Sequence, residues 1–91
     1  NFIHIRWIND NVNYSTIHTA KKKHAVKISL TKLRQRLPMG HFVQVHRSYI
    51  VQTELITNID LTTLEVYLDD VALPLGRTYK DDLINQLNLL Q

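Results

Sequence analysis

The segment FVQVHRSYIV, residues 42–51, places a histidine, an arginine and a serine inside an otherwise apolar run. The valine, isoleucine and aromatic residues on either side of this triplet indicate buried strand. An imidazole, a guanidinium and a hydroxyl can all donate hydrogen bonds to an anion or to a base edge. His46, Arg47 and Ser48 could therefore form a turn, a ligand site or a recognition loop, and only the rest of the chain distinguishes these alternatives.

The histidines and the carboxylates are the other groups that could do chemistry. His18 and His24 flank AKKK, residues 20–23, and could face each other across that hairpin as two metal ligands. Two ligands fall short of a metal site and three adjacent lysines repel a cation, so we expect surface or strand-edge histidines instead. No phosphate-binding glycine loop, nucleophile elbow or H-E-x-x-H motif occurs in the sequence. The sequence predicts neither an enzyme nor a bound cofactor.

Charge is distributed very unevenly along the chain. Residues 11–53 contain eight Lys or Arg residues and no acidic residue, whereas residues 54–91 contain seven acidic residues and only two basic ones. This segregation is expected of a nucleic-acid binder, because one surface attracts a polyanion while the other keeps the protein soluble. A solvated basic face that has no partner is the alternative.

The length of 91 residues indicates one domain, residues 1–91, with a single modest core, which favours a binding module over an enzyme. There is no cysteine, so stability cannot depend on disulfides or on a thiolate-bound metal. No apolar stretch approaches the roughly 20 residues that span a bilayer, and the N-terminus lacks the pattern of a signal peptide. We therefore expect a soluble, cytoplasmic protein.

A period of two dominates the hydrophobic pattern, which predicts antiparallel β structure. Residues 64–68 and 71–75 alternate apolar and polar side chains around Asp69 and Asp70, as in a hairpin with one buried face. Val66 should face inward in that hairpin. Further strands are predicted at residues 2–8, 13–19, 24–28 and 55–60, with turns at 9–11 and 20–23.

Two segments have helical spacing instead. Leucines at helical intervals follow Ser29, a good N-cap residue, and Pro38 ends the segment, which predicts a short helix over residues 30–37. Thr78 and Asp81 resemble a capping box at the start of a C-terminal helix. The apolar face of that second helix is formed by Leu83, Ile84, Leu87 and Leu90.

Four motifs resemble those of the LytTR family of DNA-binding domains. H-R-S-Y-I-V at 46–51, preceded by an F-x-x-V strand, is similar to the family motif H-R-S-Y-[IL]-V. The other three are N-Y-S-T-I-H-T at 13–19, V-K-I-S-L-T-K-L at 26–33 and L-P-L-G-R-T-Y-K at 73–80. They occur in the family's order and cover nearly all of the chain. Asn9 departs from the family, which often has an acidic residue there, so no salt bridge is expected at that place.

The resemblance implies an elongated, mostly β module of antiparallel sheets with one or two short helices. It implies sequence-specific binding of double-stranded DNA for transcription regulation, by the output domain of a bacterial two-component response regulator. Loops between strands, in place of a recognition helix, would enter successive major grooves. The resemblance also implies an upstream receiver or sensor domain outside this sequence, a dimer on repeated sites in the full-length protein, and a first strand that is shortened or missing here.

Motif positions in the family's three base-reading loops correspond to Asn13, Arg47 and Arg77. An arginine fork can pair with O6 and N7 of guanine, and an asparagine amide can pair with N6 and N7 of adenine. A structural salt bridge is the alternative for the two arginines. For Asn13 the alternative is an ordinary turn residue.

Other residues are better suited to the DNA backbone than to bases. Hydroxyl groups, the N–H groups at a helix start and lysines all bind phosphates. These backbone candidates are Ser29, His46, Ser48, Lys80, Lys21, Lys22 and Lys23. A buried, hydrogen-bonded loop histidine remains the alternative for His46, and a solvated hairpin tip the alternative for the three adjacent lysines.

Two other functions stay open at this point. The chain could be a β-rich protein-interaction or regulatory module that has kept the fold and lost DNA binding. It could also bind single strands or RNA, but that mode requires exposed stacking aromatics. The aromatic residues here mostly occupy positions that look inward, so double-stranded DNA is the preferred partner.

Overall fold

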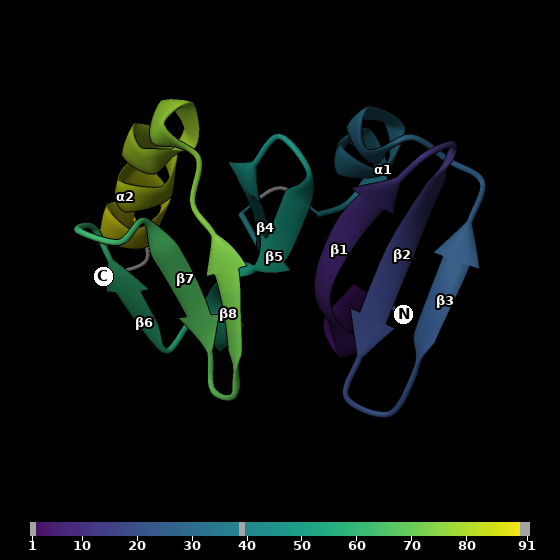
Figure 1. Cartoon of the computed structure of the whole chain (residues 1–91), viewed down its shortest axis with the longest axis horizontal. Helices are drawn as coiled ribbons and strands as arrows, with labels where there is room; N and C mark the ends of the chain where they lie inside the picture. The colour runs from purple at the N-terminus through teal and green to yellow at the C-terminus, as the bar shows by residue number, and fades with distance from the viewer. Residues whose placement is uncertain (1, 39, 90–91) are drawn as a thin grey trace.

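The strands form two antiparallel sheets that lie side by side (Figure 1). The computed structural model describes residues 2–38 and 40–89. One sheet has the strand order β3-β2-β1-β5-β4, and the other has the order β6-β7-β8. Their bounds are β1 Ile5–Asn11, β2 Tyr14–Thr19, β3 Lys23–Val26, β4 Phe42–His46, β5 Tyr49–Gln52, β6 Asn58–Asp60, β7 Glu65–Leu68 and β8 Val71–Pro74.

Two short helices, α1 Leu30–Arg36 and α2 Lys80–Leu89, pack against the sheets. Phe2–His4, Thr53–Leu55 and Arg77–Tyr79 form single 3₁₀ turns. The predicted fold class, mostly antiparallel β with short helices, is therefore confirmed. Among residues 2–38 and 40–89, no helix is both long enough and apolar enough to cross a membrane.

The turn between β1 and β2 lies at Val12 and Asn13, and the prediction of a turn at residues 9–11 was wrong. Those three residues extend β1 and pair with residues 14–16 of β2. Polar side chains suit this end of the hairpin because it is exposed to solvent. At the other end, β1 begins at Ile5 instead of Phe2, because residues 2–4 turn as a 3₁₀ helix.

The β4–β5 hairpin lies between two hydrophobic cores. Ile50 packs with residues of β1 and α1 on one face of β5. Its neighbour Val51 packs with Val43, Val45, the three-stranded sheet and α2 on the other face. Adjacent strand residues point to opposite faces, so a strand covered on both faces is apolar at nearly every position. This explains the apolar run around the polar triplet, in which Arg47 and Ser48 form the turn.

The three-stranded sheet follows the predicted alternation. Asp69 and Asp70 make the turn between β7 and β8, and Asp69 has a φ of 52°. Val66 is completely buried, as predicted. The strand predicted over residues 55–60 is shorter than expected, because a 3₁₀ turn occupies Thr53–Leu55 and β6 begins at Asn58.

The helix starts follow the sequence signals in one of two cases. Ser29 caps α1 as predicted, and its Oγ accepts a hydrogen bond from the Lys32 N–H at 3.2 Å. Thr78 does not cap α2, because it lies inside the 3₁₀ turn that leads into that helix. Leu83 is fully buried, whereas Leu90 lies outside the described residues.

The two sheets divide the molecule along its longest axis, with extents of 32 × 26 × 24 Å (Figure 1). The five-stranded sheet and α1 occupy one end, and the three-stranded sheet and α2 occupy the other, so the elongation is mild. The basic segment, residues 11–53, and the acidic segment, residues 54–91, are therefore separated in space as well as in sequence.

Candidate nucleic-acid interface

Three connections between elements lie along one edge of the molecule, uppermost in Figure 1. They are the β1–β2 turn at residues 12–13, the β4–β5 turn at residues 47–48 and the β8–α2 connection at residues 75–79. The N-terminal end of α1 lies on the same edge. We call these four segments the upper edge. It brings together Asn13, Arg47 and Arg77, the three residues expected to read bases, and all three are exposed.

Backbone hydrogen bonds hold the three connections together. The N–H of Asp10, near the end of β1, donates to the carbonyl of Ser48 at 3.1 Å. On the other side, the N–H of Gly76 donates to the carbonyl of Val45 at 2.7 Å. The β4–β5 turn is therefore tied to both of its neighbours, and the two cores beneath it make its platform rigid.

His46 shapes the β4–β5 turn from within. Its Nδ1 accepts a hydrogen bond from the Ser48 N–H at 3.1 Å. Its ring meets Tyr49 edge to face, with a centroid distance of 5.6 Å. The neutral imidazole then carries its hydrogen on Nε2, which leaves that nitrogen as a donor. His46 thus has a structural role in the turn, and its Nε2 is still chemically suited to a phosphate.

Gly76 leaves room for the ring of Tyr79 beside the β4–β5 turn. A Cβ at residue 76 would lie 2.9 Å from Cδ2 of Tyr79 and 3.5 Å from the Cα of His46. Its backbone conformation is one that any residue can adopt, with a φ of −73°. Close packing, and not conformational freedom, is therefore what the glycine supplies here.

Asn13 has a conformational reason to be at its position. Its φ is 68°, in the left-handed region that asparagine tolerates better than most residues with a side chain. The turn thus favours asparagine or glycine at this position, and the exposed amide remains available to a ligand.

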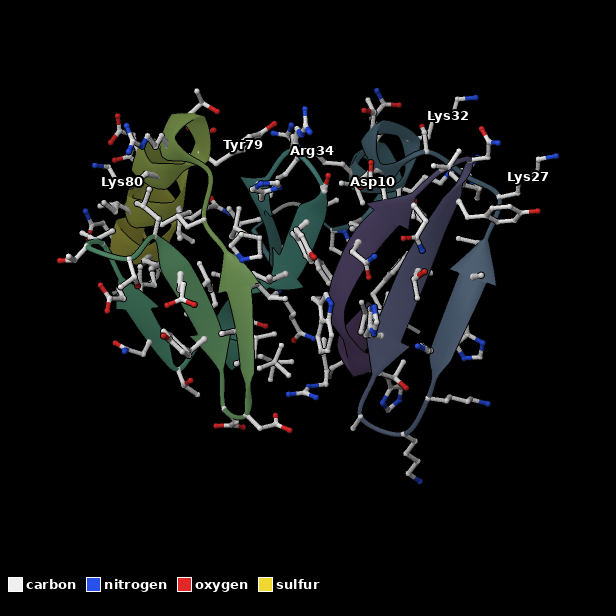
Figure 2. All side chains as sticks on the ribbon, in the orientation of Figure 1. Asp10, Lys27, Lys32, Arg34, Tyr79 and Lys80 are labelled. Atoms are coloured by element: carbon white, nitrogen blue, oxygen red, sulfur yellow. The ribbon has the colours of Figure 1, made fainter. Side chains whose placement is uncertain are left out.

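Basic side chains line the upper edge on both sides of the β4–β5 turn. Figure 2 shows Lys27 just beyond the end of β3, Lys32 and Arg34 near α1, and Lys80 at the start of α2. Ser29 lies between the first two lysines in sequence, and its capping role leaves its hydroxyl hydrogen available to donate. Sequence reasoning did not select Lys27, Lys32 or Arg34 as candidates. The N-cap at Ser29 was the available signal for Lys27 and Lys32, because residues close to a cap lie at the same end of the helix. Arg34 lies in the last turn of α1, and that signal does not extend to it.

Lys21, Lys22 and Lys23 lie far from the other predicted contacts. They are at the β2–β3 connection, at the opposite end of β2 from Asn13. The six residues of β2 span about 20 Å, and Figure 1 shows the β2–β3 connection at the lower edge. A duplex that lies on the upper edge would not reach them.

The two histidines considered as metal ligands do not face each other. In the β2–β3 register His24 pairs with Ile17 and His18 pairs with Lys23, so the two imidazoles project from opposite faces of the sheet. The facing arrangement considered for them therefore does not occur, and His24 lies exposed on the edge strand β3, as expected. No group of three or more potential ligands occurs within residues 2–38 and 40–89.

His18 instead belongs to a stacked cluster on the sheet face. The centroid of its ring lies 4.1 Å from that of Trp7, and the two ring planes are 10° apart. The Cζ of Arg6 lies 5.3 Å from the centroid of the Trp7 ring. Its Nε2 is hydrogen-bonded to Oδ1 of Asn9, the residue that departs from the family pattern. Burial, together with the nearby charges of Lys23 and Arg6, lowers the pKa of His18.

Two aromatic side chains lie along the upper edge: Tyr14, which follows Asn13 in the β1–β2 turn, and the partly buried Tyr79 (Figure 2). Phe2 and Tyr14 are exposed, at 44% and 45%, so the expectation that the aromatic residues look inward was wrong for these two. Trp7, Phe42, Tyr49 and Tyr67 are half-buried. Of these aromatic residues only Tyr14 is exposed beside the three connections, and single-strand binding uses a series of stacking aromatics, so this distribution favours a duplex.

A family model described as the LytTr DNA-binding domain matches residues 1–88. The chain belongs to the LytTR family of DNA-binding domains. Family membership supports DNA as its partner over the alternative of a protein-interaction module, and the family is a regulatory one and not an enzyme class. A LytTr DNA-binding domain from Bacillus cereus has the same fold, with a TM-score of 0.85 at 21% identity over 94% of this chain and 83% of that one.

Curated relatives are 29–30% identical to this chain in sequence. The transcriptional regulatory protein LytR of Staphylococcus aureus (strain MW2) is 29% identical over 80 residues, which are 84% of this chain and 32% of that protein. The sensory transduction protein LytT of Bacillus subtilis is 30% identical over 77 residues, 80% of this chain and 32% of that protein. The chain thus spans about a third of the length of these relatives.

Proposed function

We propose that the chain is the sequence-reading domain of a bacterial transcriptional regulator and that the upper edge is the surface that binds double-stranded DNA. The observation that carries this proposal is the placement of Asn13, Arg47 and Arg77 on three connections tied together along one edge. Each of these side chains is exposed and can contact a base edge.

The dimensions of the molecule support this mode of binding. Its longest extent is 32 Å, close to the roughly 34 Å that separate equivalent grooves one helical turn apart. Turns at the two ends of the upper edge can therefore approach successive major grooves on one side of the duplex, with the β4–β5 turn between them.

Arg47 and Arg77 are the proposed guanine contacts, and Asn13 is the proposed adenine contact. Ser29, Ser48, Lys80 and the Nε2 of His46 are proposed to bind phosphates. To these we add Lys27, Lys32 and Arg34, because they lie on the same edge. Lys21, Lys22 and Lys23 are left out because they lie at the lower edge.

The remaining proposals concern the whole protein. The relatives are named as transcriptional regulatory and sensory transduction proteins of about three times this length. We propose that this chain is likewise the output domain of a cytoplasmic two-component response regulator. A receiver or sensor domain would precede it, and the full-length protein would bind repeated sites as a dimer.

The substitution Arg47→Ala tests the reading role. The probes are a duplex selected by the unmodified protein from a random-sequence pool and a scrambled duplex of the same composition. We expect the affinity for the selected duplex to fall about 5- to 150-fold, the equivalent of 1–3 kcal/mol, with the preference relaxed at one base position. Scrambled-duplex affinity should change much less.

Lys22→Ala is the matched control, since it removes one positive charge at the lower edge. It should leave both affinities unchanged. Equal losses on the two duplexes for Arg47→Ala would make Arg47 a backbone contact, and a large fall in its melting temperature would make it structural.

A further inference from the structure

Gln44 connects α1 to the backbone of the β4–β5 turn. Its Nε2 donates to the carbonyls of His46 at 3.1 Å and Arg47 at 3.3 Å. Its Oε1 accepts from Nη1 of Arg34 at 3.2 Å. The partners fix the orientation of the amide, because a carbonyl only accepts and a guanidinium only donates.

The turn needs this support because β4 is irregular just before it. The register between β4 and β5 shifts between Gln44 and His46. The carbonyl of the intervening Val45 accepts from Gly76 at 2.7 Å, outside the β4–β5 ladder. A bulge interrupts ladder pairing, and Gln44 supplies a donor to each of the next two carbonyls.

Arg34 completes the connection and faces the same edge as the turn (Figure 2). It lies in α1, is exposed and uses one of its guanidinium N–H groups for Gln44. A guanidinium has five N–H groups, so it can bond to Gln44 and to a phosphate at once. A phosphate contact near α1 would thereby restrain Gln44 and, through it, the backbone of Arg47.

We propose that Gln44 and Arg34 are positioning residues that hold the Arg47 turn in the geometry in which the arginine meets its base. Gln44 contributes to sequence preference through the Arg47 backbone and not through a base contact of its own. Base recognition needs side chains held within about 0.5 Å of the productive geometry. A turn released from this restraint should therefore lose its preference for the selected duplex before it loses affinity for DNA in general. This inference rests on the proposed function, because it requires that Arg47 reads a base.

The experiment is a double-mutant cycle with Gln44→Met and Arg47→Ala, measured by anisotropy on the selected and scrambled duplexes. We expect Gln44→Met to lower the affinity for the selected duplex about 5-fold or more and to leave the scrambled duplex nearly unchanged. Combined with Arg47→Ala, it should cause no further loss. Gln86→Met is the matched control, because α2 runs away from the upper edge and carries Gln86 about 9 Å beyond Lys80.

Several results would overturn the inference. They are an unchanged selected-duplex affinity for Gln44→Met, an equal loss on both duplexes, and a loss that persists undiminished in the Arg47→Ala background. Should Gln44→Met fail to fold, Arg34→Met removes the partner of Gln44 in α1 and leaves β4 intact. The ratio of the selected-duplex affinity to the scrambled-duplex affinity should then fall. An unchanged ratio would contradict the inference. A selected-duplex affinity that is insensitive to Arg47→Ala would instead refute the proposed function.

Discussion

Asn13 combines two properties that one substitution can separate. Its backbone lies at a φ of 68°, and its amide is exposed on the upper edge. We expect Asn13→Gly to keep the hairpin intact, because glycine adopts positive φ without strain, while affinity for the selected duplex falls. Asn13→Ala should in addition destabilise the fold by about 1 kcal/mol.

Melting temperatures and duplex titrations of both variants check this expectation. If Asn13→Gly binds the selected duplex as tightly as the unmodified protein, Asn13 is a turn residue alone.

His18 should titrate at an unusually low pH. Its pKa is lowered from 6.5 by burial and by the charges of Lys23 and Arg6, so the folded state disfavours the imidazolium. A group whose pKa is depressed on folding contributes stability above its unfolded pKa, and that contribution is lost as the pH falls through the folded-state value. Stability should therefore decline as the pH falls below about 6.5.

The stack on Trp7, the single tryptophan, gives a local readout of this titration. Trp7 emission should change with a midpoint below 6.5, and His18→Phe should abolish that transition. A midpoint at or above 6.5 would show that His18 is not shielded in solution.

Motif positions in the sequence were enough to select Asn13, Arg47 and Arg77 as candidates. The role of Gln44 could not be predicted, because it depends on a bulge that moves two carbonyls into reach of one amide. Whether His18 and His24 share a face of the sheet could not be predicted for a similar reason. A shift of one residue in a hairpin moves a side chain to the opposite face.

Period-two alternation predicted the β7–β8 hairpin of the smaller sheet correctly, since one face is buried and one is solvated there. The stretch at residues 9–11 misled because polar residues at the exposed end of a long hairpin resemble a turn. Thr78 misled because a 3₁₀ turn precedes α2, so the capping pattern fell inside the turn and not at the start of the helix.

Val66 lies in the middle of β7 and is completely buried in the core shared with β4, β5 and α2. Val66→Asp should place an unpaired carboxylate in this core and lower the free energy of unfolding by at least about 3 kcal/mol, enough to unfold a small domain. Ala72→Asp is the control, since Ala72 is exposed on the neighbouring strand β8. Chemical denaturation of both variants measures the difference, and cooperative unfolding of Val66→Asp at near-normal stability would contradict the packing.

The separation of charge between the two ends could be read from the sequence, because residues 11–53 lack acidic side chains. The edge on which each lysine lies could not, since that depends on the strand directions and on the exact positions of the turns. Lys21, Lys22 and Lys23 were grouped with the other contacts on charge alone, and antiparallel pairing separates them by the length of β2. Lys27 and Lys32 reach the upper edge because α1 begins there.

The salt dependence of duplex binding tests the upper edge most directly. Each phosphate that a lysine neutralises adds about 0.9 to the slope of log affinity against log salt concentration. Lys27→Ala with Lys32→Ala removes two charges from the upper edge, and Lys21→Ala with Lys22→Ala removes two from the lower edge, so the two proteins have the same net charge. We expect the first pair to reduce the slope by about 1.8 and the second pair to leave it unchanged. A reduced slope for the lower-edge pair with an unchanged slope for the upper-edge pair would contradict the assignment of the DNA-binding surface.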